Sequence, residues 1–283
     1  MLQLKSRLIL IYFISLRLQN EYSKMKRLVI VGCGKLGNIV VDAMLRGLLN
    51  DYELVGVYSR TRAKAESLAA RVAGCAVCDG VEELLELAPH YVVEAASPAA
   101  MREVALPALR QGASVVTLSI GAFADDAFYT EVMQTAQENH AHVYIVSGAT
   151  GGFDVLQTAT LMGEAEARFF NEKGPNALKG TPVYDDALQH EQRTVFKGTA
   201  TEAIAKFPTK VNVTVAASRA SVGPQNMQVT MQSTPGFVGD TQRVEIKNKQ
   251  VHAVIDVYSA TAEIAGWSVE NTLRNIVSPI VFC

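Results

Sequence analysis

A glycine motif behind a short apolar segment constrains this chain more than any other feature. Residues 28–31 read Leu-Val-Ile-Val, and Gly32, Gly34 and Gly37 follow them in G-x-G-x-x-G spacing. Apolar residues at helical spacing begin directly behind, at Leu36. In such a unit the first glycine permits the turn, the second lets the backbone approach a pyrophosphate, and the third lets helix and strand pack closely. The motif therefore predicts a dinucleotide site at a helix N-terminus.

The same alternation of apolar segments and helical repeats continues to about residue 147. Four more strands are predicted, at 53–58, 91–94, 114–119 and 142–146. From about 165 to 257 apolar residues recur with a period of two, which indicates a mixed sheet. We predict an α/β fold with three parts. These are a dinucleotide-binding Rossmann domain with a doubly wound parallel sheet at 25–147, a second, α+β domain with a mixed sheet for substrate and dimerisation at 148–260, and a C-terminal helical segment, 261–283, that packs back on the first domain.

Composition and charge limit the partners. The 283 residues are 49% hydrophobic with a formal net charge of −2, so neither nucleic acid nor an anionic membrane is expected as a partner. The apolar run 8–16 is too short to span a bilayer, so residues 1–24 are expected to lie outside the fold, with a membrane anchor as the alternative. The C-x-x-C pair Cys75 and Cys78 lacks a second pair, and no metal site is expected. These features favour a cytoplasmic protein that acts on a small molecule.

The end of the second predicted strand bears on the choice of cofactor. An enzyme that uses NAD places Asp or Glu here, to bind the ribose 2′-hydroxyl. This chain has Ser59, Arg60 and Arg62 instead, and hydroxyl and guanidinium groups can hold a 2′-phosphate. The sequence therefore favours NADP, with NAD as the alternative. In a second interpretation both arginines simply begin a solvent-exposed helix.

Loops at the carboxyl ends of the later strands are expected to surround the nicotinamide ring, because this edge of a doubly wound sheet holds the ligand. After strand 91–94, Ser97 can cap a helix that Pro98 begins. After strand 142–146, a segment of small side chains leaves room for a substrate. The sequence assigns Gly32, Gly34, Lys35, Leu36, Gly37, Ser59, Arg60, Arg62, Ala96, Ser97 and Pro98 to the cofactor, and Ser147, Gly148, Ala149 and Thr150 to the substrate.

Several longer motifs together resemble one family. They are Val31-Gly-Cys-Gly-Lys-Leu-Gly37, Glu94-Ala-Ala-Ser-Pro98, Ser119-Ile-Gly-Ala-Phe-Ala-Asp125, Ser147-Gly-Ala-Thr-Gly-Gly-Phe-Asp-Val155, Val195-Phe-Lys-Gly198, Phe207-Pro-Thr-Lys-Val-Asn-Val213 and Thr272-Leu-Arg-Asn275. Over about residues 26–283 the chain resembles the L-aspartate dehydrogenases. The resemblance implies a two-domain Rossmann-type fold, a homodimer formed with the help of the second sheet, and reversible oxidative deamination of an amino acid through an imine. It also assigns Ala122 and Asn212 to the cofactor.

Two departures from the family concern the substrate half. The family's catalytic His precedes a strand that matches 242–246, so Gln242 stands at the His position. A glutamine can donate and accept hydrogen bonds but cannot act as a general acid or base. The family's Asn-Pro-Lys-Thr segment is Tyr258-Ser-Ala-Thr261 here, without the lysine that could help to hold a substrate carboxylate. The chain is therefore expected to be a divergent member that lacks the family's catalytic His.

Other charged residues remain open as partners of the substrate. Arg219, Lys210 and Asp154 are candidates, although each is more typical of a surface or structural position. None of the five histidines has a spacing that singles it out, and His190 is the one in a polar loop of the second domain.

Two classes of function follow. The first is an NAD(P)-dependent dehydrogenase acting on CH–NH₂ groups, with an amino acid or imine substrate that differs from aspartate. The second is a nucleotide-binding protein that has lost this chemistry and regulates or binds a partner. A reductase of the homoserine or dipicolinate type would explain the Rossmann half but not the later motifs.

Overall fold

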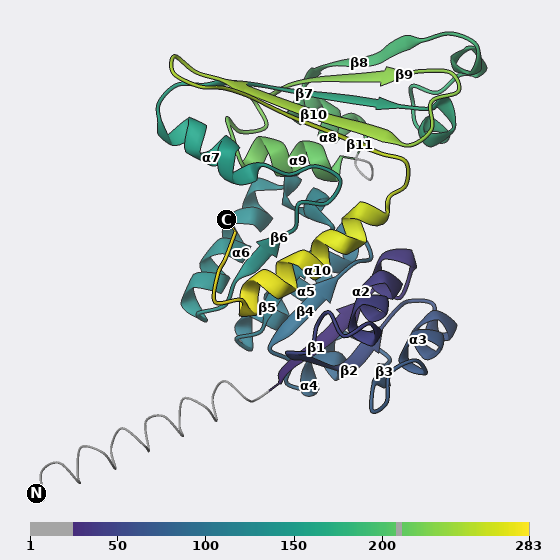
Figure 1. Ribbon diagram of the computed structural model, residues 1–283, viewed down its shortest axis with the longest axis vertical. Helices are drawn as coiled ribbons and strands as arrows, with labels where there is room; N and C mark the ends of the chain where they lie inside the picture. Colours follow the sequence, from purple (N-terminus) through teal and green to yellow (C-terminus); the bar gives the residue numbers. More distant parts are fainter. Residues whose placement is uncertain (1–24, 208–210, 283) are drawn as a thin grey trace, which may run out of the picture.

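A computed structural model describes residues 25–207 and 211–282 of the chain, so the expectation for residues 1–24 lies outside the described residues. Two sheets, stacked one above the other in Figure 1, form the centres of two domains. The predicted α/β fold class is confirmed: a six-stranded parallel Rossmann sheet and a five-stranded mixed sheet.

The first sheet has the strand order β3-β2-β1-β4-β5-β6, and every neighbouring pair is parallel. The order reverses between β1 and β4, and such a switch point is where a doubly wound sheet binds its ligand. Strand β3 was not predicted, because three residues are too few to give a pattern. The strands are β1 (Lys26–Val31), β2 (Tyr52–Tyr58), β3 (Ala76–Cys78), β4 (Tyr91–Glu94), β5 (Ser114–Thr117) and β6 (Val143–Ile145).

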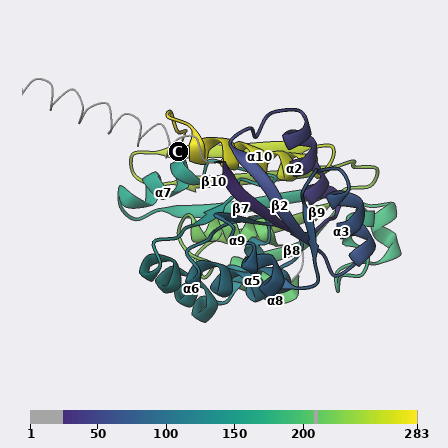
Figure 2. The ribbon, with the colours of Figure 1, turned by 90° about the horizontal axis from the view of Figure 1, so that it is seen from below.

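Helices cover both faces of this sheet (Figure 2). Helices α2, α3 and α10 bury apolar side chains on one face, and α4, α5 and α6 do so on the other. The bounds are α2 (Lys35–Leu45), α3 (Arg62–Ala69), α4 (Val81–Glu86), α5 (Pro98–Arg110), η1 (Ile120–Ala124), α6 (Asp126–Glu138) and α10 (Glu263–Val277). Within residues 25–207 and 211–282, no helix has both the length and the apolar character needed to cross a membrane.

The second sheet has the order β11-β10-β7-β9-β8, with β7 and β9 parallel and the other neighbours antiparallel. Helices α7, α8 and α9 lie between this sheet and the first domain (Figure 1). The elements are α7 (Phe153–Leu161), β7 (Glu166–Lys173), η2 (Pro175–Leu178), η3 (Asp186–Gln189), β8 (Arg193–Thr199), α8 (Ala200–Lys206), α9 (Asn212–Arg219), β9 (Gln228–Ser233), β10 (Asp240–Lys247) and β11 (His252–Ser259).

The chain crosses between the domains twice. It enters the second domain after β6 and returns after β11 into α10, which packs against α2. The contact is close, because a Cβ on Gly266 of α10 would lie 2.7 Å from the Ile39 side chain. The Tyr52 hydroxyl donates to the Leu273 carbonyl oxygen at 2.7 Å. One apolar cluster runs from α5 and η1 through to the inner face of the second sheet, so the domains share a core.

Candidate functional site

The three motif glycines have different surroundings. Gly32 has φ +104°, and a Cβ there would lie 2.7 Å from the backbone of Ala95. A Cβ on Gly37 would lie 2.2 Å from the Gly32 carbonyl oxygen, so this glycine permits the close approach of helix and turn. A Cβ on Gly34 would meet no atom within 4 Å, which leaves open space above the N-terminus of α2. The loop therefore fits a bound pyrophosphate, which would take that space.

A cleft of about 260 Å³ opens in front of this loop, and we call it the dinucleotide cleft. It brings together Gly32 and Gly34 after β1, Ser59 and Arg60 after β2, and Ala96 and Ser97 after β4. Lys64, the third residue of α3, lines the cleft as well, although sequence reasoning did not single it out. The lining also includes one carboxylate, that of Glu103 on α5.

Seven residues assigned to the cofactor do not line this cleft: Lys35, Leu36, Gly37, Arg62, Pro98, Ala122 and Asn212. The Arg62 guanidinium pairs with Glu66 and Asp79, which hold it on the exposed side of α3. The Lys35 ammonium lies 3.0 Å from a Glu263 carboxylate oxygen, at the start of α10. Pro98 occupies the first helical position of α5, and its neighbour Ser97 accepts a hydrogen bond from the Ala100 amide at 3.2 Å.

A buried carboxylate supports the loops around the switch point. Glu94, at the end of β4, is 0% exposed. Its Oε1 accepts hydrogen bonds from the Ala96 and Ser97 amides, each at 2.9 Å, and from the Ser119 hydroxyl at 3.0 Å, while its Oε2 accepts from Thr117 Oγ1. Burial raises the pKa of Glu94, and these donors offset part of that rise. The carboxylate thus joins the loops after β4 and β5.

A second cavity, of about 210 Å³, adjoins the dinucleotide cleft, and we call it the crevice. Ala95 and Ala96 line both cavities. The other walls come from Leu36, Ser119, Ser147, Gly148, Ala149 and Asn212, among others. Small, mostly uncharged side chains at the carboxyl ends of β4, β5 and β6 suit an aromatic ring held against the backbone.

Hydrogen bonds between the domains fix the far wall of the crevice. Asn212 Oδ1 accepts from the Gly121 amide at 2.8 Å, so α9 is tied to the turn after β5. The Gly148 amide, at φ +62°, donates to Ser268 Oγ of α10 at 3.1 Å. Ala122 lies behind this wall, 1% exposed, with its carbonyl oxygen accepting from Arg102.

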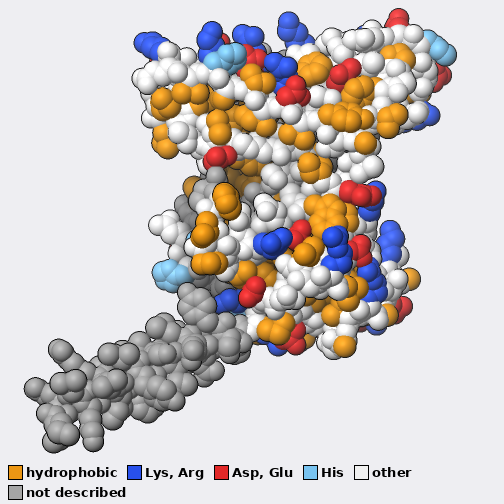
Figure 3. All heavy atoms as spheres, viewed as in Figure 1, with side chains coloured by type: hydrophobic (Ala, Val, Ile, Leu, Met, Phe, Trp, Pro, Cys, Tyr) orange, Lys and Arg blue, Asp and Glu red, His pale blue; other side chains and the backbone are white. Residues whose placement is uncertain are grey.

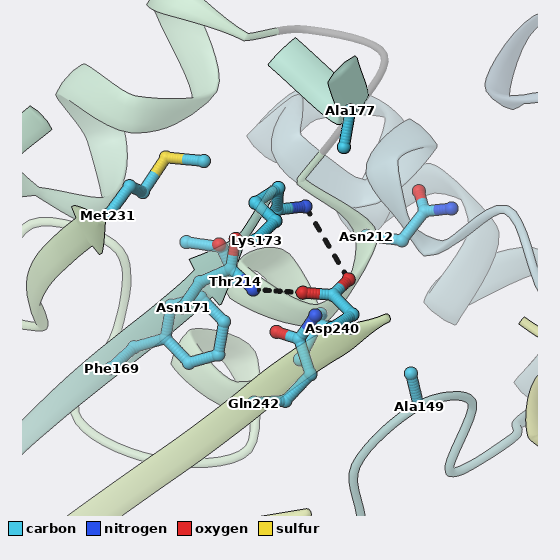
Figure 4. A pocket seen from close by; sticks show the side chains of 11 residues that line it. Ala149, Phe169, Asn171, Lys173, Ala177, Asn212, Thr214, Met231, Asp240 and Gln242 are labelled. Atoms are coloured by element: carbon cyan, nitrogen blue, oxygen red, sulfur yellow. Dashed lines mark hydrogen bonds and ion pairs between the residues drawn. The ribbon is translucent and has the colours of Figure 1, made fainter. Parts of the chain in front are cut away.

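A third cavity, of about 300 Å³, lies under the inner face of the second sheet, and we call it the inner pocket (Figure 4). Ala149, Asn212 and Val213 line both the crevice and the inner pocket, so the two adjoin. The remaining lining is Phe169, Asn171, Lys173, Ala177, Thr214, Met231, Asp240 and Gln242. The three cavities therefore form one series from the glycine loop to the second sheet.

The two charged side chains of the described inner-pocket lining come from two neighbouring strands. Lys173 Nζ of β7 lies 3.5 Å from Asp240 Oδ2 of β10, and Asn171 Nδ2 donates to Asp240 Oδ1 at 2.5 Å. Sequence reasoning noted the loss of one lysine but not the presence of Lys173. The alternation of β7 could have shown it, because residues 169, 171 and 173 share one face.

Gln242, the residue at the family's His position in the resemblance, lines the same pocket (Figure 4). The residue is 4% exposed, and its Oε1 is buried without a hydrogen-bond partner among the described residues. Thr150 is also buried, 7% exposed, with an unpartnered hydroxyl, but it does not line the pocket.

The other candidates lie elsewhere. Arg219 donates to the Phe123 carbonyl oxygen at 3.0 Å and lies over the Tyr129 ring, so it holds the two domains together. Asp154 is exposed in the first turn of α7, and Lys210 lies outside the described residues. All five histidines are exposed, and none lines these three cavities.

The described cysteines, Cys33, Cys75 and Cys78, offer neither a metal site nor a reactive thiolate. Burial raises the pKa of Cys33 to about 11 and that of Cys75 to about 12, so both stay protonated at neutral pH. Among residues 25–207 and 211–282 no cluster of His, Cys, Asp and Glu could hold a metal ion.

Comparisons with known proteins match two parts of the chain to family models. Residues 32–146 match the family model described as homoserine dehydrogenase, NAD binding domain, and residues 154–276 match that of aspartate dehydrogenase, C-terminal. The chain is 32% identical to an L-aspartate dehydrogenase of Methanococcus maripaludis over 90% of its own length and 98% of the relative's. It is 28% identical to the L-aspartate dehydrogenase of Acinetobacter baylyi over 90% of its own length and 99% of that relative's.

Solved structures show the same similarity. Aspartate dehydrogenase from Thermotoga maritima is 25% identical, with a TM-score of 0.72, over 91% of this chain and 99% of that one. A hyperthermophilic archaeal homoserine dehydrogenase in complex with NADPH is 15% identical, with a TM-score of 0.61, over 91% of this chain and 100% of that one. At this identity the similarity shows a shared fold alone.

Proposed function

The chain belongs to the L-aspartate dehydrogenase family of NAD(P)-dependent oxidoreductases, and from this premise we propose that it interconverts an amino acid and its 2-oxo acid with NADP(H). The reaction balances as amino acid, water and NADP⁺ giving 2-oxo acid, ammonium, NADPH and a proton. The observation that carries the proposal is the wall shared by the crevice and the inner pocket at Ala149, Asn212 and Val213. A substrate in the pocket would lie directly beside a ring in the crevice.

When bound, the nicotinamide supplies or accepts the hydride at the substrate carbon. The chain's part is to position the two, because hydride transfer needs the reacting carbons about 3–3.5 Å apart. The glycine loop and the N-terminus of α2 would hold the pyrophosphate. Glu94 fixes the loops after β4 and β5, and Asn212 fixes the opposite wall through Gly121.

Proton transfer is the step in which this chain would differ from its family. Gln242 can hold a substrate N–H or a water but cannot take up a proton at neutral pH. The titratable groups of the described pocket lining are Lys173 and Asp240. Proton exchange with the substrate nitrogen would therefore fall to this pair or to water.

We propose NADP as the preferred cofactor. Ser59, Arg60 and Lys64 line the part of the cleft beside the end of β2, where a 2′-phosphate would lie. Two cations and a hydroxyl favour that phosphate over a free 2′-hydroxyl.

We also infer a homodimer that forms through the outer face of the second sheet. That face carries the exposed side chains of Val254 and Tyr258 on the edge strand β11. Basic side chains gather at the top of Figure 3. Arg168, Lys197, Arg243 and Glu245 line one hollow of the second sheet. An edge strand with exposed apolar side chains is usually covered by another surface. Because this face carries both positive and negative side chains, the same face of a second copy could complement it. Sedimentation of the purified chain tests this inference. We expect the mass of a dimer, and the mass of a monomer would contradict it.

The direct test of function is NADPH oxidation with ammonia and a panel of 2-oxo acids, after NADPH binding has been measured by fluorescence. Binding with turnover supports a dehydrogenase. Binding without turnover on any member would favour the alternative, a nucleotide-binding protein that has lost this chemistry.

The unpaired cysteines Cys33, Cys75 and Cys78 support the inference of a reducing, cytoplasmic location.

A further inference from the structure

The inner pocket carries one positive and one negative side chain in its described lining, those of Lys173 and Asp240. From this pairing we infer that the pocket takes the zwitterionic head of a monocarboxylic 2-amino acid with an uncharged side chain, and the matching 2-oxo acid in the reverse direction. This inference rests on the proposed function, and it specifies the substrate class for the same site.

Lys173 is placed to bind a carboxylate. Its side chain is 12% exposed, and its ammonium has one acceptor among the described residues, Asp240 Oδ2 at 3.5 Å. An ammonium has three N–H donors, so two remain for a ligand in the pocket. A nearly buried cation with spare donors is a strong site for a carboxylate.

Asp240 and Gln242 are placed to bind the substrate nitrogen. Asp240 accepts from Asn171 through Oδ1 and from Lys173 through Oδ2, but a carboxylate has about four acceptor positions. Gln242 Oε1 is buried and has no partner among the described residues, which is costly unless a ligand donates to it. An ammonium or iminium N–H satisfies both acceptors.

The remaining walls decide against a second carboxylate. Phe169, Met231 and Ala177 are apolar, and the described lining has no cation besides Lys173 (Figure 4). A zwitterionic head is neutral and matches the neutral Lys173–Asp240 pair. The other polar side chains of the described lining, Asn171, Asn212, Thr214 and Gln242, are neutral, so the side-chain carboxylate of aspartate would be buried without a cation to pair with it, which is costly. At about 300 Å³ the pocket suits a small substrate.

Three probes test the inference on the wild-type chain. They are 2-oxobutyrate, oxaloacetate, which adds a second carboxylate, and propanal, which lacks the carboxylate of 2-oxobutyrate. Each is supplied with ammonia and NADPH, and NADPH binding is measured separately. We expect kcat/KM for 2-oxobutyrate to exceed that for oxaloacetate by about a hundredfold, the order of the loss on leaving a buried charge unpaired.

Lys173→Met then tests the anchor, with Lys249→Met as the matched control in the exposed β10–β11 turn. Lys173→Met is expected to raise KM for 2-oxobutyrate by about tenfold to a hundredfold and KM for propanal far less, whereas a share of Lys173 in proton exchange would lower kcat for both probes alike. If thermal melts show that the lone Asp240 carboxylate destabilises this variant, the double variant Lys173→Met with Asp240→Asn removes both charges, and the ratio of its KM values for 2-oxobutyrate and propanal serves for the same comparison.

The outcomes separate the two proposals. Preference for oxaloacetate would overturn the substrate class and leave the dehydrogenase function standing. An equal rise of KM for 2-oxobutyrate and propanal in Lys173→Met would overturn the role of Lys173 in binding the substrate carboxylate. NADPH binding without turnover of any probe would overturn the proposed function itself.

Discussion

Gly34 should be required for cofactor binding and dispensable for folding. Its φ of −82° is open to any residue, and a Cβ there would meet no protein atom within 4 Å. Gly34→Ala should therefore leave the free energy of unfolding unchanged or raise it by about 0.4–1 kcal/mol, through lower entropy of the unfolded chain.

The same methyl group would take the space left for the pyrophosphate. Displacing a phosphate from backbone N–H donors forfeits charge-assisted hydrogen bonds of about 1.5–3 kcal/mol each. The loss of one such bond weakens NADPH binding by about tenfold to about a hundredfold. Gly34→Val, with a larger side chain, should abolish measurable binding.

Gly37→Ala is the contrasting variant. Its Cβ would lie 2.2 Å from the Gly32 carbonyl oxygen, a backbone atom that cannot move aside. We expect this variant to lose about 1–3 kcal/mol of stability, as in other overpacked sites. Thermal unfolding and NADPH fluorescence titration measure both effects. Unchanged NADPH affinity in a folded Gly34→Val protein would remove Gly34 from the cofactor site and refute the reasoning.

Three further predictions address the cofactor, the buried carboxylate and Gln242. Arg60→Asp should weaken the binding of NADPH by about a hundredfold and that of NADH by much less, because it places a carboxylate near the 2′-phosphate. Equal losses of affinity for the two cofactors in fluorescence titrations would refute the preference for NADP. The folded-state pKa of Glu94 is raised, so its contribution to stability is full below the unfolded pKa of about 4.3 and is lost as pH rises through the folded pKa. Thermal melts should therefore show that the stability of wild type relative to Glu94→Gln rises as pH falls from about 8 to about 4.5. A relative stability that rises with increasing pH would contradict this. Gln242→His should add an ionisation near pH 6.5, about the unperturbed value for His, to the profile of kcat, and an unaltered profile would place residue 242 away from the chemistry.

The first domain was predictable because its signals are local. Each strand of the Rossmann sheet is a short apolar run followed by a turn and a helix, so neighbouring residues in the sequence suffice. Strand β3 is the exception, since Ala76–Cys78 is short and edges the sheet. Side-chain direction was less predictable: Arg62 is two residues from Arg60, yet its pairing with Glu66 and Asp79 turns it away from the cleft.

The inner pocket was harder to predict, because its polar groups are distant in sequence. Lys173 and Asp240 meet only when β7 pairs with β10, and no local pattern gives that register. The resemblance to the family predicted a role for Gln242 from the sequence. The proximity of Lys173 and Asp240 could be recognised only from the fold.

The central claim is that hydride passes between a nicotinamide in the crevice and an amino acid carbon in the inner pocket. The most direct measurement uses NADPH deuterated at C4, in each of its two stereoisomers, with ammonia and 2-oxobutyrate. Mass spectrometry of the product should find one deuterium at C2 of the 2-amino acid from one of the two stereoisomers. Oxidation of both without deuterium in an amino acid product would contradict the claim.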